Sequence, residues 1–556
     1  LYWGFGFTDE LSWGWDEAMH AELPAARLVL STEAIRPAAA MAAVHDSDRY
    51  PIVFPAMLAV PQFLFGISED VARRSAVAVW CLALLAIFLL GREFARAARG
   101  PDDTPRRGEV WVPWLALAFA AASPMGLALG SSLFLEAPFV LTGALAMRGW
   151  LRRGAYLGEE GRLVRERRAG AWFVLAFFTK FNYCLLLALG CGIDWLIEGL
   201  VEWRAGRGRF FVRRTAHLLM LPAIVGFWWF ITPLPHGFET AAEHREAFRE
   251  FISGNQSGNG QSDELRFLYL SCFFTITLRA FALQCFGALA GLGAALRGSR
   301  VLWLTLAATF VPIWLHPFFL ERFWLPLGVS LWPLAALGIA RCLPRQRFVA
   351  AAILVALGVG VAIHPTADVV RLADRFGMLQ EDEKLAAYQQ EVFATFSELG
   401  RDRQVPKRPA LRREEREELD ALIAGVVKPN ESVGWLGISS EYSPAALHLG
   451  LLENGGSPAR FLRDAHQPVD LEFRGNLGYG EWTNDDLAEW ANQFDVILMS
   501  DPVDFNQREG RGFMRPLQRR LCDDLGWTEE RIGLIDRART LRDPLRIRIF
   551  AVRPPR

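Results

Sequence analysis

Lysine is almost absent from this chain, although arginine is abundant. Only four of the 60 basic residues are lysines (Lys180, Lys384, Lys407 and Lys428), so Lys180 is alone in the first 383 residues. Basic and acidic residues nearly balance, and the net charge is −1. Such a balance lacks the excess of positive charge that nucleic-acid binding requires. We therefore expect no nucleic acid among the partners.

The seven cysteines do not have the spacing of a metal site or a disulfide framework. No Cys-x-x-Cys and no zinc-like Cys/His pattern occurs, and six of the seven lie in or beside apolar segments. We interpret them as small packing residues. No cofactor or metal is indicated, although the sequence does not exclude a divalent metal.

Long apolar segments are present instead, in a chain that is 52% hydrophobic. Most are near the ~20 residues that cross a bilayer as a helix. The expected spans are 75–91, 110–128, 133–150, 170–180 with 182–197 (a pair broken at Lys180), 215–233, 274–296, 301–318, 323–340 and 348–364. Residues 51–66 contain three prolines and fit an interfacial helix better. The pattern predicts a polytopic α-helical membrane protein with about ten or more spans.

Arginine placement predicts the orientation of these spans. One set of alternate links contains 22 arginines, and the other contains five arginines or lysines. Because basic links stay in the cytoplasm, the second set is expected outside the cytoplasmic membrane. Residues 1–50, the loop 234–265 and everything after 364 then lie outside. Since the chain starts without Met or a leading apolar segment, we expect one preceding span to be missing.

Residues 365–556 are charged and contain no apolar span. Helical periodicity occurs at 381–397 and 410–426, and helices are also expected at 443–452 and 484–492. Runs typical of strands occur at 432–438, 495–499 and 547–552. The expected organisation is a membrane domain over 1–364 and a soluble extracytoplasmic α/β domain over 365–556.

The most suggestive polar motif is the adjacent carboxylate pair Asp16-Glu17, which follows Trp13 and Trp15 in the predicted outer segment. Ionisable residues at membrane depth, such as Glu136 and Lys180, are functional candidates because keeping them there costs several kcal/mol. Two other interpretations are structural. Glu136 would hydrogen-bond a neighbouring helix, and Lys180 would extend its amine from a helix end toward water.

The order of motifs resembles the polytopic GT-C glycosyltransferases, especially bacterial protein mannosyltransferases and the aminoarabinose transferase of lipid A. The matching stretches are Asp16-Glu17-Ala18, Arg49-Tyr50-Pro51 with Phe54-Pro55, Phe65-Gly66-Ile67-Ser68-Glu69, Glu136 within 131–138, Thr179-Lys180, and Glu321-Arg322-Phe323-Trp324-Leu325-Pro326. These motifs cover most of the membrane half. The resemblance implies transfer of a sugar from a polyprenyl-phosphate carrier to a lipid, glycan or protein acceptor on the outer face, with inversion.

The resemblance also implies roles for individual residues. Asp16 would be the general base, with Glu17 beside it and Glu136 as a second acidic site. Lys180, Arg49 and Arg322 would neutralise the donor phosphate as it leaves. Arg279 is a further cationic candidate, by its position near the outer end of a span; no family role is carried onto it.

Two other classes of function remain open. A lipid or glycan transporter or flippase also needs polar groups at membrane depth, but usually has internal repeats and paired broken helices. Only one broken pair and no repeat is visible here. A non-catalytic membrane scaffold would explain the two-part chain, but it gives no reason for Asp16, Glu136 and Lys180.

Overall fold

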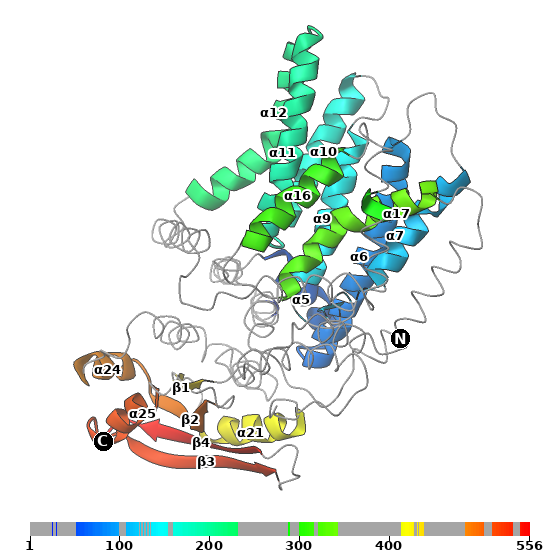
Figure 1. The fold of residues 1–556 in the computed structure, drawn as a ribbon. Coiled ribbons are helices and arrows are strands. Elements are labelled where there is room, and N and C mark those ends of the chain that lie inside the picture. Colours follow the sequence, from blue (N-terminus) through cyan, green and yellow to red (C-terminus); the bar gives the residue numbers. More distant parts are fainter. Residues whose placement is uncertain are drawn as a thin grey trace. The chain divides into compact units, whose positions relative to one another are not determined.

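A computed structural model of the chain describes a bundle of helices and a four-stranded sheet (Figure 1). The residues that the structure describes are 25, 29, 52–98, 107–121, 123, 126, 129–130, 133, 135–153, 159–231, 287–289, 300–315, 321–342, 413–427, 431, 433–438, 484–504, 514–537 and 545–555. The predicted spans 274–296 (except 287–289) and 348–364 lie outside them, as do the predicted helices 381–397 and 443–452.

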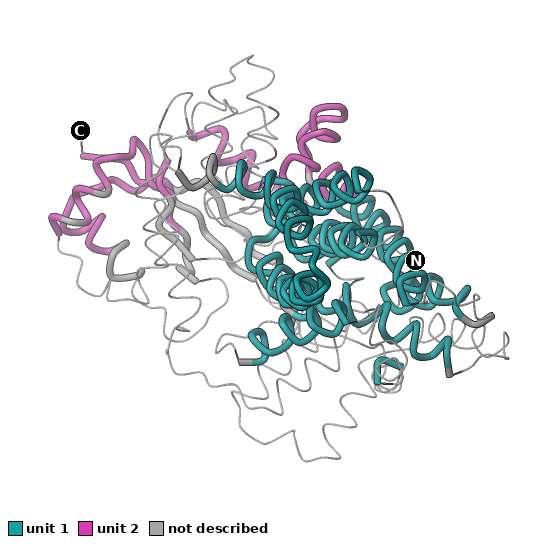
Figure 2. The backbone as a smooth tube through the Cα atoms, turned by 90° about the horizontal axis from the view of Figure 1, so that it is seen from above, with its two compact units in different colours: residues 1–2, 48–54, 76–405 teal, residues 3–47, 55–75, 406–556 magenta. Residues whose placement is uncertain are grey.

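The chain divides into two compact units, which Figure 2 shows in different colours. One contains residues 1–2, 48–54 and 76–405, and the other contains 3–47, 55–75 and 406–556. The predicted domain boundary at 364 lies outside the described residues and stays a prediction.

The helices that form the bundle follow one another with short connections. They are α5 (Val53–Phe65), α6 (Glu69–Ala97), η2 (Arg107–Trp111), α7 (Val112–Ala121), α9 (Glu136–Arg152), α10 (Glu159–Phe177), α11 (Phe181–Arg204), α12 (Gly208–Ile231), α16 (Arg300–Leu315), η3 (Glu321–Leu327) and α17 (Gly328–Cys342). Three described stretches are long and apolar enough to cross a membrane, namely Asp70–Ala97, Phe181–Arg204 and Trp324–Arg341. The last is almost wholly buried, so α17 is a central helix of its unit.

Several helices extend into links that the sequence analysis had treated as loops. α10 begins at Glu159, eleven residues before the expected start of its span, and α12 begins at Gly208 instead of 215. The expectation of a short first half before Lys180 was therefore wrong. The physical reason is that charged side chains in these turns, such as Glu166 and Arg214, pair with each other inside the bundle.

Glycines bring two pairs of helices unusually close. A Cβ added to Gly170 of α10 would lie 2.2 Å from the carbonyl oxygen of Leu218 on α12. At Gly190 of α11 it would lie 2.5 Å from Cα of Thr305 on α16. Small residues permit such backbone contact in membrane bundles, where dispersion and hydrogen bonds dominate helix association. Any side chain at either position would separate these helices.

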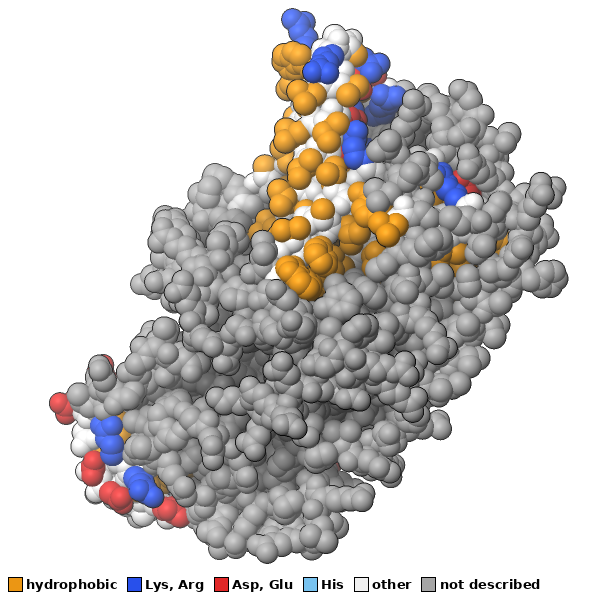
Figure 3. Space-filling view, viewed as in Figure 1, with side chains coloured by type: hydrophobic (Ala, Val, Ile, Leu, Met, Phe, Trp, Pro, Cys, Tyr) orange, Lys and Arg blue, Asp and Glu red, His pale blue; other side chains and the backbone are white. Residues whose placement is uncertain are grey.

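One face of α11 is apolar and exposed. Leu185, Leu189, Ile193, Leu196 and Leu200 recur every three or four residues and are all exposed. Figure 3 shows hydrophobic side chains gathered along this part of the surface, with basic side chains at its tip. Since the spacing places them on one side of the helix, this face is suited to contact lipid.

The second unit contains a mixed sheet with the strand order β1-β2-β4-β3. The strands are β1 (Val433–Ile438), β2 (Val496–Asp504), β3 (Thr528–Arg537) and β4 (Leu545–Arg553). β1 is parallel to β2, and the other two pairings are antiparallel. The three strands expected from sequence are present, as are helices α21 (Arg413–Val426) and α24 (Asn484–Ala491), whereas β3 and α25 (Met514–Asp523) were not predicted.

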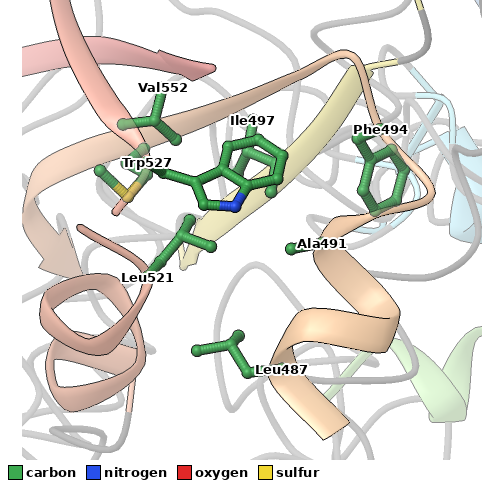
Figure 4. Packing of buried hydrophobic residues seen from close by; sticks show 8 residues of the cluster. Leu487, Ala491, Phe494, Ile497, Leu521, Trp527 and Val552 are labelled. Atoms are coloured by element: carbon green, nitrogen blue, oxygen red, sulfur yellow. The ribbon is translucent and has the colours of Figure 1, made fainter. Parts of the chain in front are cut away.

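A compact hydrophobic cluster joins this sheet to its helices (Figure 4). Trp527 lies among Ile497 of β2, Val552 of β4 and Leu521 of α25. Ala491 of α24 belongs to the same cluster. Burial of such side chains stabilises a fold by about 1.5–3 kcal/mol for each large residue.

Cys522 borders this cluster, and burial together with Glu529 and Asp523 raises the pKa of its thiol. We expect iodoacetamide to alkylate Cys522 more slowly at pH 8 than it alkylates the unfolded chain, because the thiolate is the nucleophile. Since the folded pKa is raised, its stabilising contribution is complete below the unfolded pKa and is lost as pH rises through the folded pKa. Mass-spectrometric rates measure this effect, and equal rates would contradict it.

Candidate functional site

Glu136 is the first residue of α9 and is almost completely buried. Its neighbour Leu135 provides no side-chain cap. A carboxylate in the first turn interacts favourably with the unpaired amides and with the positive end of the helix dipole. The position therefore suits a negative charge even though it is buried.

Lys180 occupies the junction between α10 and α11. α10 ends at Phe177, and the backbone of Lys180 is extended (φ −160°, ψ 103°) before α11 begins at Phe181. Thr179 continues the turn, because its hydroxyl donates to the carbonyl of Leu175 at 2.7 Å. The break predicted at Lys180 is confirmed. Its side chain is 19% exposed, so it is less enclosed than Glu136.

These two charged groups meet across the N-terminal ends of α9 and α11. Lys180 Nζ lies 3.5 Å from Glu136 Oε1, and the Tyr183 hydroxyl is 3.4 Å from the same oxygen. Tyr183 also lies beneath the ammonium, 5.7 Å from it to the ring centroid, and packs against Phe139. The hydrogen bond between helices that was the structural interpretation of Glu136 is thus present, together with an ion pair.

The proline-containing helix α5 is attached to the same junction. The Val53 amide donates to the carbonyl of Phe178 at 2.9 Å, two residues before Lys180. The Phe178 ring in turn packs against Phe177 and Phe181. The predicted helix at 51–66 is therefore observed as Val53–Phe65, and its start contacts the residues that hold Lys180.

The helical turn η3, which contains Arg322, lies at this end of the bundle. α17 follows η3, and its distant end brings Arg341 within 3.1 Å of the carbonyl of Ala98, just beyond α6. The last turn of α9 reaches the same end of α6, because Arg152 lies 3.6 Å from Glu93. Hence η3, which packs on α9, lies toward the end where α9 begins.

The other predicted site residues cannot be compared with this geometry. Asp16, Glu17, Arg49 and Arg279 lie outside the described residues, as does the loop 234–265. For Arg322 the structure describes the backbone alone. Of the seven predicted site residues, Glu136 and Lys180 are the ones whose side chains the structure brings together.

Metal binding is not indicated by the described part of the chain. Within it, no three His, Cys, Asp or Glu side chains form a group that could hold an ion. Chemistry at the pair described above would have to use a carboxylate, an ammonium and a phenol. Such a set can bind and orient an anion beside a buried negative charge.

A second charged cluster, which sequence reasoning missed, lies at the opposite end of α9. Its members are three arginines and three acids from five helices: Arg153, Glu166, Asp194, Glu198, Arg214 and Arg300. Arg214 donates to Glu166 at 2.6 Å and to Glu198 at 2.7 Å. Arg300 donates to Asp194 at 2.7 Å, and Arg153 lies 3.4 Å from Glu166. We call these six residues the balanced network, because their formal charges cancel.

Aromatic rings enclose the balanced network. The Trp150 indole donates to Asp194 at 2.9 Å, and the Arg153 guanidinium lies 3.3 Å from the centroid of the Trp150 ring. Trp195 lies between Arg153 and Arg214. The four i, i+4 or i+3 positions that separate Glu from Arg along one helix do not produce this cluster. A signal in the sequence was nevertheless available, because Asp194 interrupts an apolar span.

Comparison with known proteins gives a structural match. No family model matches the chain, and no curated protein matches its sequence. The crystal structure of ArnT from Cupriavidus metallidurans in the apo state is similar over 99% of this chain and 95% of that chain, with a TM-score of 0.54 and 16% identity. The structure of the same protein bound to undecaprenyl phosphate covers 99% and 96%, with a TM-score of 0.51 and 16% identity. This chain therefore has the polytopic membrane fold of the GT-C aminoarabinose transferase ArnT, as the order of its motifs predicted.

Proposed function

We propose that this protein is an integral-membrane glycosyltransferase that takes a sugar from a polyprenyl-phosphate carrier. The observation that carries the proposal is the contact between Lys180 and buried Glu136 at the N-terminal ends of two helices. The fold adds support, because the similar ArnT was crystallised with undecaprenyl phosphate. The sugar passes to a lipid, glycan or protein acceptor on the outer face of the cytoplasmic membrane, and the soluble domain over 365–556 lies on that face.

Lys180 binds the phosphate of the donor in this proposal. Its ammonium has three N–H donors, and among the described residues its one acidic partner within 4 Å is Glu136. A phosphate oxygen therefore has donors available to it without displacing that partner. Negative charge grows on this phosphate as the bond to the sugar breaks, and a fixed cation stabilises it. Arg49, Arg322 and Arg279 are proposed to add further positive charge there.

Glu136 serves first to position Lys180. Its carboxylate is 1% exposed and contacts both Lys180 and Tyr183, so it restrains the amine through two neighbours. A general base must come within hydrogen-bond reach of the acceptor hydroxyl. Burial makes that harder for Glu136 than for a residue in an outer segment. We therefore assign the base to Asp16, with Glu17 as its neighbour, and keep Glu136 as the second acidic residue of the site.

Replacing Lys180 by Met tests the donor-binding role, because Met keeps the apolar stem and removes the charge. We expect binding of a polyprenyl phosphate to weaken by about 1.5–3 kcal/mol, since the lost hydrogen bond involves two charged partners. Titration of the purified protein with the lipid, followed by native mass spectrometry, measures this loss.

A matched control is Arg207→Met, because Arg207 is an exposed cation paired with Glu202 at the other end of α11. Its donor affinity should be that of the parent. Unchanged donor binding in a folded Lys180→Met protein would refute the assignment. A second variant, Glu136→Gln, should weaken donor binding less than Lys180→Met, because it loosens the ammonium but leaves it in place.

A further inference from the structure

Four arginine side chains converge on a single carboxylate oxygen near the C-terminal ends of α6 and α9. Glu93 Oε1 lies 3.3 Å from Arg96, 3.6 Å from Arg152, and 3.9 Å from both Arg92 and Arg148. We call these five residues the arginine cluster. Only Arg96 is close enough to form a hydrogen bond with Glu93 in the described structure. The remaining guanidinium groups therefore share a carboxylate that they do not fully engage.

Positive charge is in clear excess in the arginine cluster. Four guanidinium groups face one carboxylate, and the C-terminal dipoles of α6 and α9 contribute only about half a negative charge each. The adjoining stretch 99–106 contains two arginines and two aspartates, so its own net charge is zero. A fifth arginine, Arg165, donates to the carbonyl of Arg152 at 2.7 Å. The balanced network, by contrast, has equal numbers of each sign.

Hydrogen-bond donors in the arginine cluster are also unused. The Nε atoms of Arg92 and Arg148 are buried, and neither has a hydrogen-bond partner within the described part of the chain. An unpaired buried donor costs about 1–3 kcal/mol. The side chains of Arg92, Arg96 and Arg152 are nevertheless 43%, 58% and 44% exposed. The cluster is thus both accessible and short of acceptors.

An exposed apolar surface leads directly to these arginines along α6. Leu85, Arg92 and Arg96 are separated by seven and four residues, which returns them to the same side of the helix within roughly 20°. Leu85 is 52% exposed. Between it and Arg92, Phe88 packs edge-on against the half-exposed Trp114 of α7. The surface therefore changes from apolar to cationic along one line.

We propose that the arginine cluster binds the phosphate of an anionic phospholipid whose acyl chains lie along Leu85, Phe88 and Trp114. A phosphodiester supplies the acceptor oxygens that Arg92 and Arg148 lack, and guanidinium groups match phosphate geometry with paired donors. The continuity with the apolar face favours a lipid over a free anion. Basic groups between spans on the cytoplasmic side commonly recognise such lipids. The site lies at the opposite end of α9 from Glu136, so it is separate from the proposed donor site.

The test uses the full chain purified in detergent and titrated with phosphatidylglycerol or phosphatidylcholine under native mass spectrometry. We expect a preference of about tenfold or more for phosphatidylglycerol. The double variant Arg92→Gln/Arg96→Gln should lose about 25-fold in phosphatidylglycerol affinity, at about fivefold for each arginine. Arg92→Lys/Arg96→Lys should retain most of the affinity, because it keeps both charges.

Arg207→Gln is the matched control, since it removes one exposed arginine that already has a carboxylate partner. Its affinity for phosphatidylglycerol should equal that of the parent. The proposal is overturned if the double Gln variant binds like the parent, if Arg207→Gln loses as much, or if phosphatidylcholine binds equally well. Displacement of the lipid by millimolar inorganic phosphate would also overturn it, because the site would then recognise a free anion.

Discussion

Replacing Asp16 by Asn is expected to lower the rate of sugar transfer by about 10²–10⁴-fold with little change in donor affinity. Asn keeps the shape and the hydrogen-bonding capacity of the side chain but cannot accept the proton of the acceptor hydroxyl. The assignment rests on the acidic motif that Asp16 forms with Glu17, and on the cationic Lys180, which suits a phosphate leaving group. Turnover and donor binding, measured on the same preparation, separate loss of the base from loss of the site.

Glu17→Gln is the matched variant, because it makes the same chemical change at the adjacent residue. It should cost less than Asp16→Asn if Glu17 only influences its neighbour, since two adjacent carboxylates raise each other's proton affinity. The reverse ranking would move the base to Glu17 within the same mechanism. Full activity in both variants would eliminate this motif and direct attention to Glu136.

Replacing Glu166 by Leu is expected to destabilise the helical unit by about 3–5 kcal/mol. Glu166 is fully buried and contacts both Arg153 and Arg214. Its removal leaves two buried guanidinium groups short of a carboxylate, which is costlier than the pair is stabilising. Thermal or SDS-induced unfolding in detergent, followed by tryptophan fluorescence, measures the change.

Arg207→Gln provides the comparison for this loss of stability. Arg207 is 61% exposed, and an exposed ion pair contributes at most about 1 kcal/mol. Addition of Arg214→Leu to Glu166→Leu should cost less than the sum of the two single changes, because the partners are lost together. A destabilisation as small as that of Arg207→Gln would show that water reaches this network and solvates its charges.

Sequence reasoning succeeded where a local pattern determines the structure. The change from apolar residues to Thr179-Lys180 ends one helix and begins another, and α10 and α11 separate at that point. β1 and β2 were likewise recognisable as short apolar runs. By contrast, β3 carries charged residues on most of its length, so its pairing with β4 provides the signal that its own sequence lacks.

The candidate site shows the same limit in another form. Glu136 and Lys180 could each be selected as costly ionisable groups within apolar segments. Their contact joins residues 44 positions apart, and it depends on how α9 packs beside α11. Helix ends were misjudged for a related reason, because Glu166 looks like part of a polar loop until Arg153 and Arg214 surround it.

The pairing of Asp194 with Arg300 has a consequence for biosynthesis. These residues are 106 positions apart, which corresponds to roughly 5–20 s of translation at ~5–20 residues per second. Throughout that interval Asp194 is already in the chain while α16 has not yet been made. Trp150 and Arg153 have both emerged earlier, and both contact Asp194 in the finished protein. We infer that they accept this carboxylate first, so that α16 joins a nascent bundle whose buried acid is never left without a partner.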